Sequence, residues 1–363
     1  MTKTALVIGA SGQVGRATVA ALAGDGWRVR AAARGERTGP PWPAELGVEP
    51  VRLDREDDAA LAAAVGAGCD VVVDMVAYGR RHADQLLGLA DRIGSAVVIS
   101  TGAVYTDDDG RAFGAEDARF PVPVTERQRT GAGGADERGA GDYAGGKVDL
   151  ERRLLAAGDR LPSTLLRAGT IHGPHTVFPR EWHFVKRALD RRPVRILTHG
   201  GASRFQPIST RNLAELIRLA AARPGSRVLN AGDPDAPTVR EIGAAIAALL
   251  DDPAEEVLID GPSPAPPVGE TPWSLRWPFV LDMTAAEREL GYRPLSDYAG
   301  TLPATVGWLI GAARDRDWRE VFPYMAGRTG EFFDYRAEDA WLATRPGRTA
   351  RPAGPGRTGG VGR

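Results

Sequence analysis

The sequence predicts an α/β fold, in which a doubly wound parallel sheet is joined to a smaller α+β lobe at the C-terminal end. Two observations predict the sheet. Short β-branched runs alternate with alanine-rich stretches of helical periodicity through the first half of the chain, as in consecutive βαβ units. Residues 71–73 and 97–99 are continuous Val and Ile, which is typical of strands covered by helices on both faces.

Six strands are expected in this first half. They are residues 5–8, 28–33, 49–53, 70–75, 96–100 and 163–167. Between them, apolar residues recur at helical spacing around residues 14–22 and 86–93, as expected for the helices that connect parallel strands.

The second half predicts a different organisation. Strands are expected at residues 194–197, 228–230 and 257–259, and Thr238 with Glu241 and Thr284 with Glu287 form capping boxes that should start helices. We therefore expect a sheet domain over residues 1–172 and a smaller lobe over residues 173–343, with some strands and helices returning to the first core. Residues 126–141, rich in glycine and charge, predict a mobile loop. The Arg-, Gly- and Pro-rich residues 344–363 predict a disordered basic tail.

Composition restricts the class of protein. The chain has 363 residues, of which 43% are hydrophobic and 26% charged, as is ordinary for a globular protein. The formal net charge of −1 gives no overall field that would attract nucleic acid or an anionic membrane. The single cysteine, Cys69, cannot form an internal disulfide, and no apolar run reaches the roughly 18–20 residues that a membrane span needs. We expect a cytoplasmic protein that binds neither nucleic acid nor membranes.

A glycine-rich turn follows the first expected strand. It reads Gly9-Ala10-Ser11-Gly12-Gln13-Val14-Gly15 and leads directly into the first expected helix. Glycine permits the tight turn and lets backbone N–H groups approach a pyrophosphate, toward which the helix directs its positive end. The spacing is GxxGxxG rather than GxGxxG, and its place after the first strand favours a dinucleotide site on a Rossmann-type sheet.

The residue that ends the second strand indicates which dinucleotide binds. NAD sites usually place an acid there and NADP sites an arginine; here the strand ends at Arg34. NADP is therefore the expected cofactor, with NAD as the alternative. Asp54, at the end of the third strand, is expected to accept from the adenine amino group or to serve as an exposed or helix-capping aspartate. Val76, Ala77 and Gly169 complete the expected cofactor-binding residues.

Tyr143 and Lys147 form a Tyr-x-x-x-Lys pair. On a helix the two side chains lie on one face about one turn apart. The ammonium is expected to lower the pKa of the phenol toward working pH. Hydroxyls at the carboxyl end of the fifth strand should lie where parallel sheets bind ligands. Strand alternation allows only one of Ser100 and Thr101 to face that site, and Thr101 is preferred.

Together these residues resemble the extended short-chain dehydrogenase/reductase family, in its NAD-dependent epimerase/dehydratase branch. The resemblance covers roughly residues 4 to 310. It rests on the glycine loop, on Asp54, and on the segments Ser100-Thr101-x-x-Val104-Tyr105, Tyr143-x-x-x-Lys147, Leu166 to Pro174, Val228-Leu229-Asn230 and Leu290-Gly291-Tyr292-x-Pro294.

The resemblance implies an oxidoreductase of a carbonyl/alcohol pair on a small or sugar-like substrate. Thr101 would fix the substrate oxygen and Tyr143 would give or take its proton. Lys147 would bind the nicotinamide ribose and tune Tyr143, while the cofactor carries the hydride. A homodimer is common in the family, and the substrate-binding part would be the C-terminal lobe.

Departures from the family pattern restrict the types of reaction and substrate that the chain is expected to use. Gly102-Ala103 replace the acid pair of the 4,6-dehydratases, Thr170 stands where sugar-nucleotide enzymes commonly have Asn, and Asn212 replaces an acid of the second lobe. Arg204 matches a diphosphate-binding arginine only loosely. A nucleotide-sugar epimerase with tightly bound NAD is therefore the alternative, and a non-catalytic cofactor-sensing or RNA-binding homologue is an alternative of another class.

Metal binding is not expected. His172 and His175 lack further ligands at suitable spacing, and residues 107–109, three aspartates, lack the spacing of a calcium loop. The tryptophans of the second half, among them Trp273 and Trp318, are assigned to packing of the smaller lobe.

Overall fold

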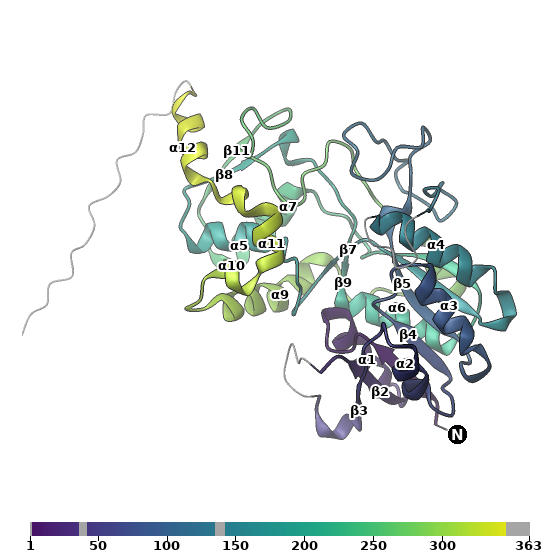
Figure 1. The fold of residues 1–363 in the computed structure, drawn as a ribbon. Coiled ribbons are helices and arrows are strands. Elements are labelled where there is room, and N and C mark those ends of the chain that lie inside the picture. Colours follow the sequence, from purple (N-terminus) through teal and green to yellow (C-terminus); the bar gives the residue numbers. More distant parts are fainter. Residues whose placement is uncertain (1, 36–41, 135–141, 346–363) are drawn as a thin grey trace, which may run out of the picture.

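The computed structural model describes residues 2–35, 42–134 and 142–345. Its larger lobe is built on a seven-stranded sheet with the strand order β10-β6-β5-β4-β1-β2-β3, all parallel. Figure 1 shows this lobe beside a smaller one that carries the C-terminal helices. The predicted fold class is confirmed. The strands are β1 (Thr4–Ile8), β2 (Arg28–Ala33), β3 (Glu49–Arg52), β4 (Val71–Asp74), β5 (Ala96–Thr101), β6 (Ser163–Ala168) and β10 (Arg227–Ala231).

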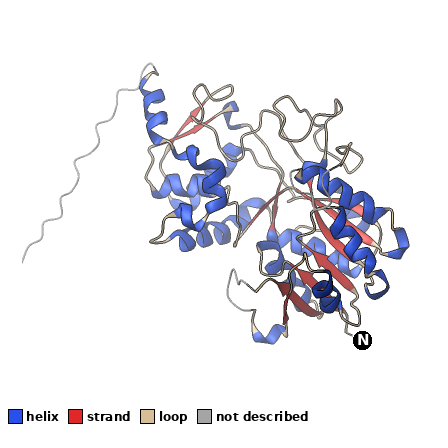
Figure 2. Ribbon diagram, viewed as in Figure 1, coloured by secondary structure: helices blue, strands red, loops and turns tan. Residues whose placement is uncertain are grey.

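Helices cover both faces of the main sheet, as Figure 2 shows. One face carries α1 (Gln13–Gly24) and α6 (Thr210–Ala222), and the other carries α2 (Asp58–Val65), α3 (Arg80–Gly88) and α4 (Tyr143–Leu155). The sheet is therefore doubly wound, and its strand order reverses between β1 and β4.

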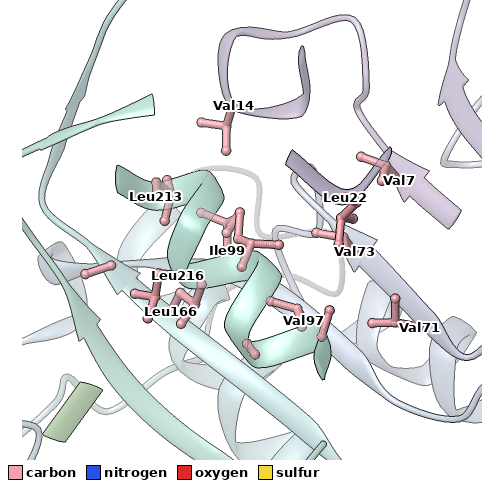
Figure 3. Close-up of a cluster of buried hydrophobic side chains, with 14 of the residues drawn as sticks. Val7, Val14, Leu22, Val71, Val73, Val97, Ile99, Leu166, Leu213 and Leu216 are labelled. Carbon is pink, nitrogen blue, oxygen red and sulfur yellow. The ribbon is translucent and has the colours of Figure 1, made fainter. Parts of the chain in front are cut away.

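Alternation along the strands divides the core into two layers. Val7, Val73 and Ile99 point toward α1 and α6, where they meet Leu22 and Leu216 (Figure 3). The intervening residues, Leu6, Val72 and Val98 among them, pack against α2, α3 and α4. Each strand is thus apolar on both faces, which explains the continuous Val and Ile runs of the sequence.

The smaller lobe has two short parallel sheets, one pairing β7 with β9 and the other pairing β8 with β11. Their bounds are β7 (Thr170–His172), β8 (Val194–Leu197), β9 (Pro207–Ser209) and β11 (Glu255–Leu258). Its helices are α5 (Trp182–Leu189), α7 (Val239–Leu250), α9 (Tyr298–Ala313), α10 (Trp318–Val321), α11 (Pro323–Thr329) and α12 (Tyr335–Ala343), whereas α8 (Thr284–Leu290) belongs to the core of the main sheet. Trp273 and Trp318 are buried in the core of the smaller lobe, as expected for packing residues.

The chain after residue 172 does not stay in one lobe. β10 is an edge strand of the main sheet, α6 covers that sheet, and α8 packs beside them. Residues 135–141 of the expected loop and 346–363 of the expected tail lie outside the described residues. Within the described part, none of the helices combines the length and the apolar character needed to cross a membrane.

One of the two predicted capping boxes is present. Thr238 caps α7 and accepts from the Glu241 N–H, while the Glu241 carboxylate accepts from the Thr238 N–H. The box at Thr284 is wrong. Helix α8 starts at Thr284 itself, whose N–H donates to the Asp282 carboxylate at 2.7 Å, so an aspartate earlier in the chain takes the role assigned to the Thr284 side chain.

Candidate active site

A cleft of about 1200 Å³ opens at the carboxyl ends of the strands of the main sheet and continues between the two lobes. Most residues proposed from the sequence line it. They are Gly9, Ser11, Gly12, Gln13, Val14, Gly15, Arg34, Asp54, Val76, Thr101, Tyr143, Lys147 and Gly169. Ala77 is fully buried and contributes its carbonyl group instead.

The glycine loop forms the floor of the cleft at its β1 end. Gly9 has a positive φ of 83°, a conformation that favours glycine. A Cβ on Gly15 would clash with the Gly9 carbonyl oxygen, so helix and loop approach this closely only because Gly15 lacks a side chain. Helix α1 has Gly12 as its N-cap and no side-chain cap, which leaves the N–H groups of its first turn for an anion such as a pyrophosphate.

The far end of the cleft contains Arg34 and Asp54, both exposed. The Asp54 carboxylate accepts from the Glu56 N–H at 3.1 Å, which fixes the turn after β3. The next residue, Arg55, is buried and forms an ion pair with Asp74 at 2.7 Å. This pair ties the turn after β3 to the end of β4.

Lys147 is buried beneath the centre of the cleft. Its Nζ donates to the Ala77 carbonyl at 2.6 Å and to the Ile99 carbonyl at 2.7 Å. Burial lowers the pKa of Lys147 to about 8, and the nearby carboxylates of Asp74 and Glu151 oppose this shift. Of its three N–H donors, one has no protein acceptor among the described residues and is available to a ligand.

Tyr143 begins α4, one turn before Lys147, and its ring centre lies 5.8 Å from the ammonium. Tyr143 is half exposed, but desolvation within the cleft raises its pKa to about 12, while hydrogen bonding to Thr101 acts in the opposite direction. The phenol is therefore neutral at physiological pH in this structure, and the expected net lowering by Lys147 is absent. The ammonium is directed at two carbonyls, which explains the difference.

Sequence reasoning missed several residues of the cleft. Tyr78 follows β4, and its ring centre lies 6.1 Å from that of Tyr143 and 4.9 Å from the Lys147 ammonium. Arg180, Tyr324 and Arg328 enter the cleft from the smaller lobe. No periodicity or motif marked them, because they come from a loop and a short C-terminal helix.

Two residues discussed from the sequence have other roles. The Arg204 Nε donates to the Ala236 carbonyl at 2.7 Å, and Arg204 lies outside the set of residues that line the cleft. At Gly102, a Cβ would come within 3.1 Å of the Phe279 ring. An aromatic cluster that includes Phe113, Phe205 and Phe279 thus crowds the position where the dehydratases carry an acid.

The described residues contain no group of three or more metal-ligating His, Cys, Asp or Glu side chains. His172 is paired with the buried Asp233 at 2.8 Å. His175 lines the cleft with a positive φ of 65°, and its ring lies 5.5 Å from that of Trp308.

Comparison with known proteins agrees with this geometry. A family model described as NAD(P)H-binding matches residues 9–123. No curated protein matches the chain in sequence. Among solved structures, MoeE5 in complex with UDP-glucose and NAD has a TM-score of 0.60 and 21% identity, over 84% of this chain and 98% of its own.

Two further structures have the same fold. Epimerase Mth375 from Methanothermobacter thermautotrophicus has a TM-score of 0.64 and 18% identity, over 88% of this chain and 94% of its own. A UDP-galactose 4-epimerase has a TM-score of 0.59 and 18% identity, over 85% of this chain and 99% of its own. Residues 9–123 therefore match an NAD(P)H-binding family model, and the chain has the fold of these epimerase structures, as the sequence resemblance implied.

Proposed function

We propose that the protein is an NAD(P)-dependent oxidoreductase that interconverts a carbonyl and an alcohol on a small or sugar-like substrate through Thr101, Tyr143 and Lys147. The observation that carries the proposal is the position of Tyr143. Its ring centre lies 5.8 Å from the Lys147 ammonium, and both residues line the same cleft as Thr101 and the glycine loop.

The residues of the cleft fit a dinucleotide. The side-chain-free turn at Gly9, Gly12 and Gly15 would hold the pyrophosphate at the start of α1, and Lys147 would donate its remaining N–H to the nicotinamide ribose. When bound, NAD(P) supplies or accepts the hydride. We propose NADP as the preferred form, because Arg34 stands at the end of β2 where a 2′-phosphate would be met.

The chain's own part in the reaction is acid–base catalysis. In the reducing direction, the neutral Tyr143 phenol donates its proton to the substrate oxygen as that oxygen gains negative charge, while Thr101 donates a hydrogen bond that orients it. The Lys147 ammonium stabilises the phenolate that remains. In the oxidising direction the same groups remove the proton, which requires ionised Tyr143.

A nucleotide-sugar epimerase is the second candidate, and the epimerase structures that share the fold favour it. Two features of this chain count against it. Thr170 stands where sugar-nucleotide enzymes commonly have Asn, and the Arg204 guanidinium is directed at a backbone carbonyl outside the cleft. We therefore rank it below the oxidoreductase.

The test uses the purified full-length chain with NADPH or NADH and a panel of ketones and aldehydes. Stoichiometric consumption of the reduced dinucleotide is expected, with Tyr143→Phe reducing kcat by roughly 10²–10⁴-fold and leaving dinucleotide affinity unchanged. Tyr335→Phe, whose hydroxyl lies on α12 and donates to Asp190, is the matched control. A protein that retains its dinucleotide without net turnover would support the epimerase, and full activity of Tyr143→Phe would contradict both.

A further inference from the structure

Two arginines enter the cleft from the smaller lobe, and the proposed reaction uses neither. Arg180 lies in the segment between β7 and α5, and Arg328 lies on α11. Both line the same cleft as Tyr143 and Lys147.

Arg180 is held without a carboxylate partner. Its guanidinium carbon lies 4.6 Å from the ring centre of Phe178, 5.5 Å from that of Phe205 and 5.8 Å from that of Trp273. No hydrogen-bond acceptor contacts it within the described residues, and its buried Nε is unsatisfied. The neighbouring Glu181 instead accepts from the Tyr298 hydroxyl at 3.0 Å.

This state is energetically unfavourable without a ligand. Burial lowers the pKa of Arg180 to about 10, and the nearby positive charge of Arg328 lowers it too, while Glu181 acts in the opposite direction. Aromatic faces compensate part of the lost hydration, but they satisfy none of the N–H donors of a guanidinium.

Arg328 connects this region to the catalytic tyrosine. Its Nη1 donates to the Tyr324 hydroxyl at 2.6 Å, and Tyr324 lies close enough to Tyr143 to raise the pKa of that phenol electrostatically. The carboxylates that line the cleft, Asp54 and Glu56, follow β3 at the other end. The smaller-lobe side of the cleft therefore presents two cations and, among the described lining residues, no acid.

We propose that Arg180 and Arg328 bind an oxyanion of the substrate, a carboxylate or a phosphate, beside the carbon that reacts at Tyr143. A guanidinium presents paired N–H groups in a fixed plane that matches two oxygens of either group. The substrate is then an anionic carbonyl or alcohol, such as a hydroxy acid or a phosphorylated sugar. This inference rests on the proposed function, because it assigns the substrate class of the same site.

The experiment measures anion binding directly. The full-length chain, saturated with the dinucleotide that it binds, is titrated with malonate and separately with inorganic phosphate, with chloride at matched ionic strength as the reference. Quenching of tryptophan fluorescence reports binding, because Trp273 lies beside Arg180, and the thermal midpoint gives an independent measure. The malonate and phosphate arms distinguish a carboxylate from a phosphate.

We expect one of the two anions to bind at least about tenfold more weakly to Arg180→Met and to Arg328→Gln. The exposed Arg316→Gln, outside the cleft, should bind like the wild type. Arg328 is exposed, so its variant remains informative if Arg180→Met folds poorly. Absence of binding to the wild type, or binding to both cleft variants as tight as to the wild type, would overturn the proposal.

Failure of the proposed function is distinguishable from failure of this inference. If neither dinucleotide binds, the oxidoreductase is excluded, and the same titrations on the dinucleotide-free chain still compare wild type with the two variants. Phosphate bound at the glycine loop would affect all of them equally, so a difference between wild type and the variants reports the arginines alone.

Discussion

The Ser100 hydroxyl donates to the Glu151 carboxylate in a buried contact between β5 and α4. The same carboxylate pairs with Arg167 on β6. Ser100 is thus fixed in the core, whereas the side chain of the following residue, Thr101, interacts with Tyr143 in the cleft. Strand alternation thus places one hydroxyl in the core and the next in the cleft.

This separation predicts different effects for two adjacent substitutions. Thr101→Val keeps the shape of the side chain and removes its hydroxyl, so kcat/KM should fall by roughly 10²-fold, the effect of losing one positioned hydrogen bond to a developing charge. The Thr101 hydroxyl also accepts from the Ala103 N–H at 3.2 Å, so the unfolding free energy should fall by about 1 kcal/mol. Steady-state kinetics with the best substrate of the panel and denaturant unfolding check the two effects.

Ser100→Ala is the matched control. It removes the Ser100 donor from the buried Glu151 Oε1, which keeps only the longer hydrogen bond from the Arg167 Nε at 3.1 Å. The loss of a hydrogen bond to a charged group should cost about 1–3 kcal/mol of unfolding free energy and leave kcat within a few-fold of the wild type. A large loss of kcat in Ser100→Ala with an active Thr101→Val would reverse the assignment.

Arg34 predicts the preference between dinucleotides. In Arg34→Ala the charge that would meet a 2′-phosphate is absent, so affinity for NADPH should fall about 10- to 100-fold while affinity for NADH stays unchanged. Fluorescence titration of the bound dinucleotide measures both. Arg28→Ala, at the opposite end of β2 and exposed, should alter neither, and equal affinities for NADPH in Arg34→Ala and wild type would show that Arg34 is a surface residue.

The raised pKa of Tyr143 predicts the pH dependence of the reaction. Desolvation holds the phenol neutral, with a pKa of about 12, so the acid needed for reduction is fully present at neutral pH. Oxidation needs the phenolate, whose fraction grows about tenfold per pH unit below the pKa. The rate of oxidation should therefore rise without a plateau up to about pH 9, as pH–rate profiles of kcat/KM would show. A plateau below about pH 8 would mean that Lys147 lowers the pKa as the sequence suggested.

Much of this arrangement follows from local sequence. The glycine loop, the strands and the Tyr143–Lys147 pair each depend on residues that are close in the chain, so pattern and spacing predict them. β2 matches its expected bounds, 28–33. Arg34 and Asp54 reach the cleft because parallel strands present their carboxyl ends at one edge.

The substrate side could not be predicted in this way. Arg180 and Tyr324 are distant in sequence and meet only through packing of the smaller lobe. The failed box at Thr284 is a local example, because Asp282 competes for the same helix start. Arg204 lies outside the cleft because its guanidinium binds the Ala236 carbonyl, and no sequence motif predicts the position of that carbonyl.

Burial of the Lys147 ammonium predicts a loss of folding stability that depends on pH. Its folded-state pKa, about 8, lies below the ordinary lysine value of 10.5 that holds in the unfolded chain, so between these pH values the unfolded state binds more protons. Stability therefore rises with pH through this window, and the penalty of burying the ammonium is fully present below pH 8.

In Lys147→Met this dependence disappears, while the Ala77 and Ile99 carbonyls lose their donor at every pH. The difference in unfolding free energy between the wild type and Lys147→Met should therefore shift by about 1 kcal/mol in favour of the wild type from pH 7 to pH 9. Urea unfolding of both proteins at each pH measures this shift. Because other titrating groups are common to the two chains, they cancel in the difference, and a difference that is constant with pH would mean that the Lys147 ammonium is not destabilised by burial.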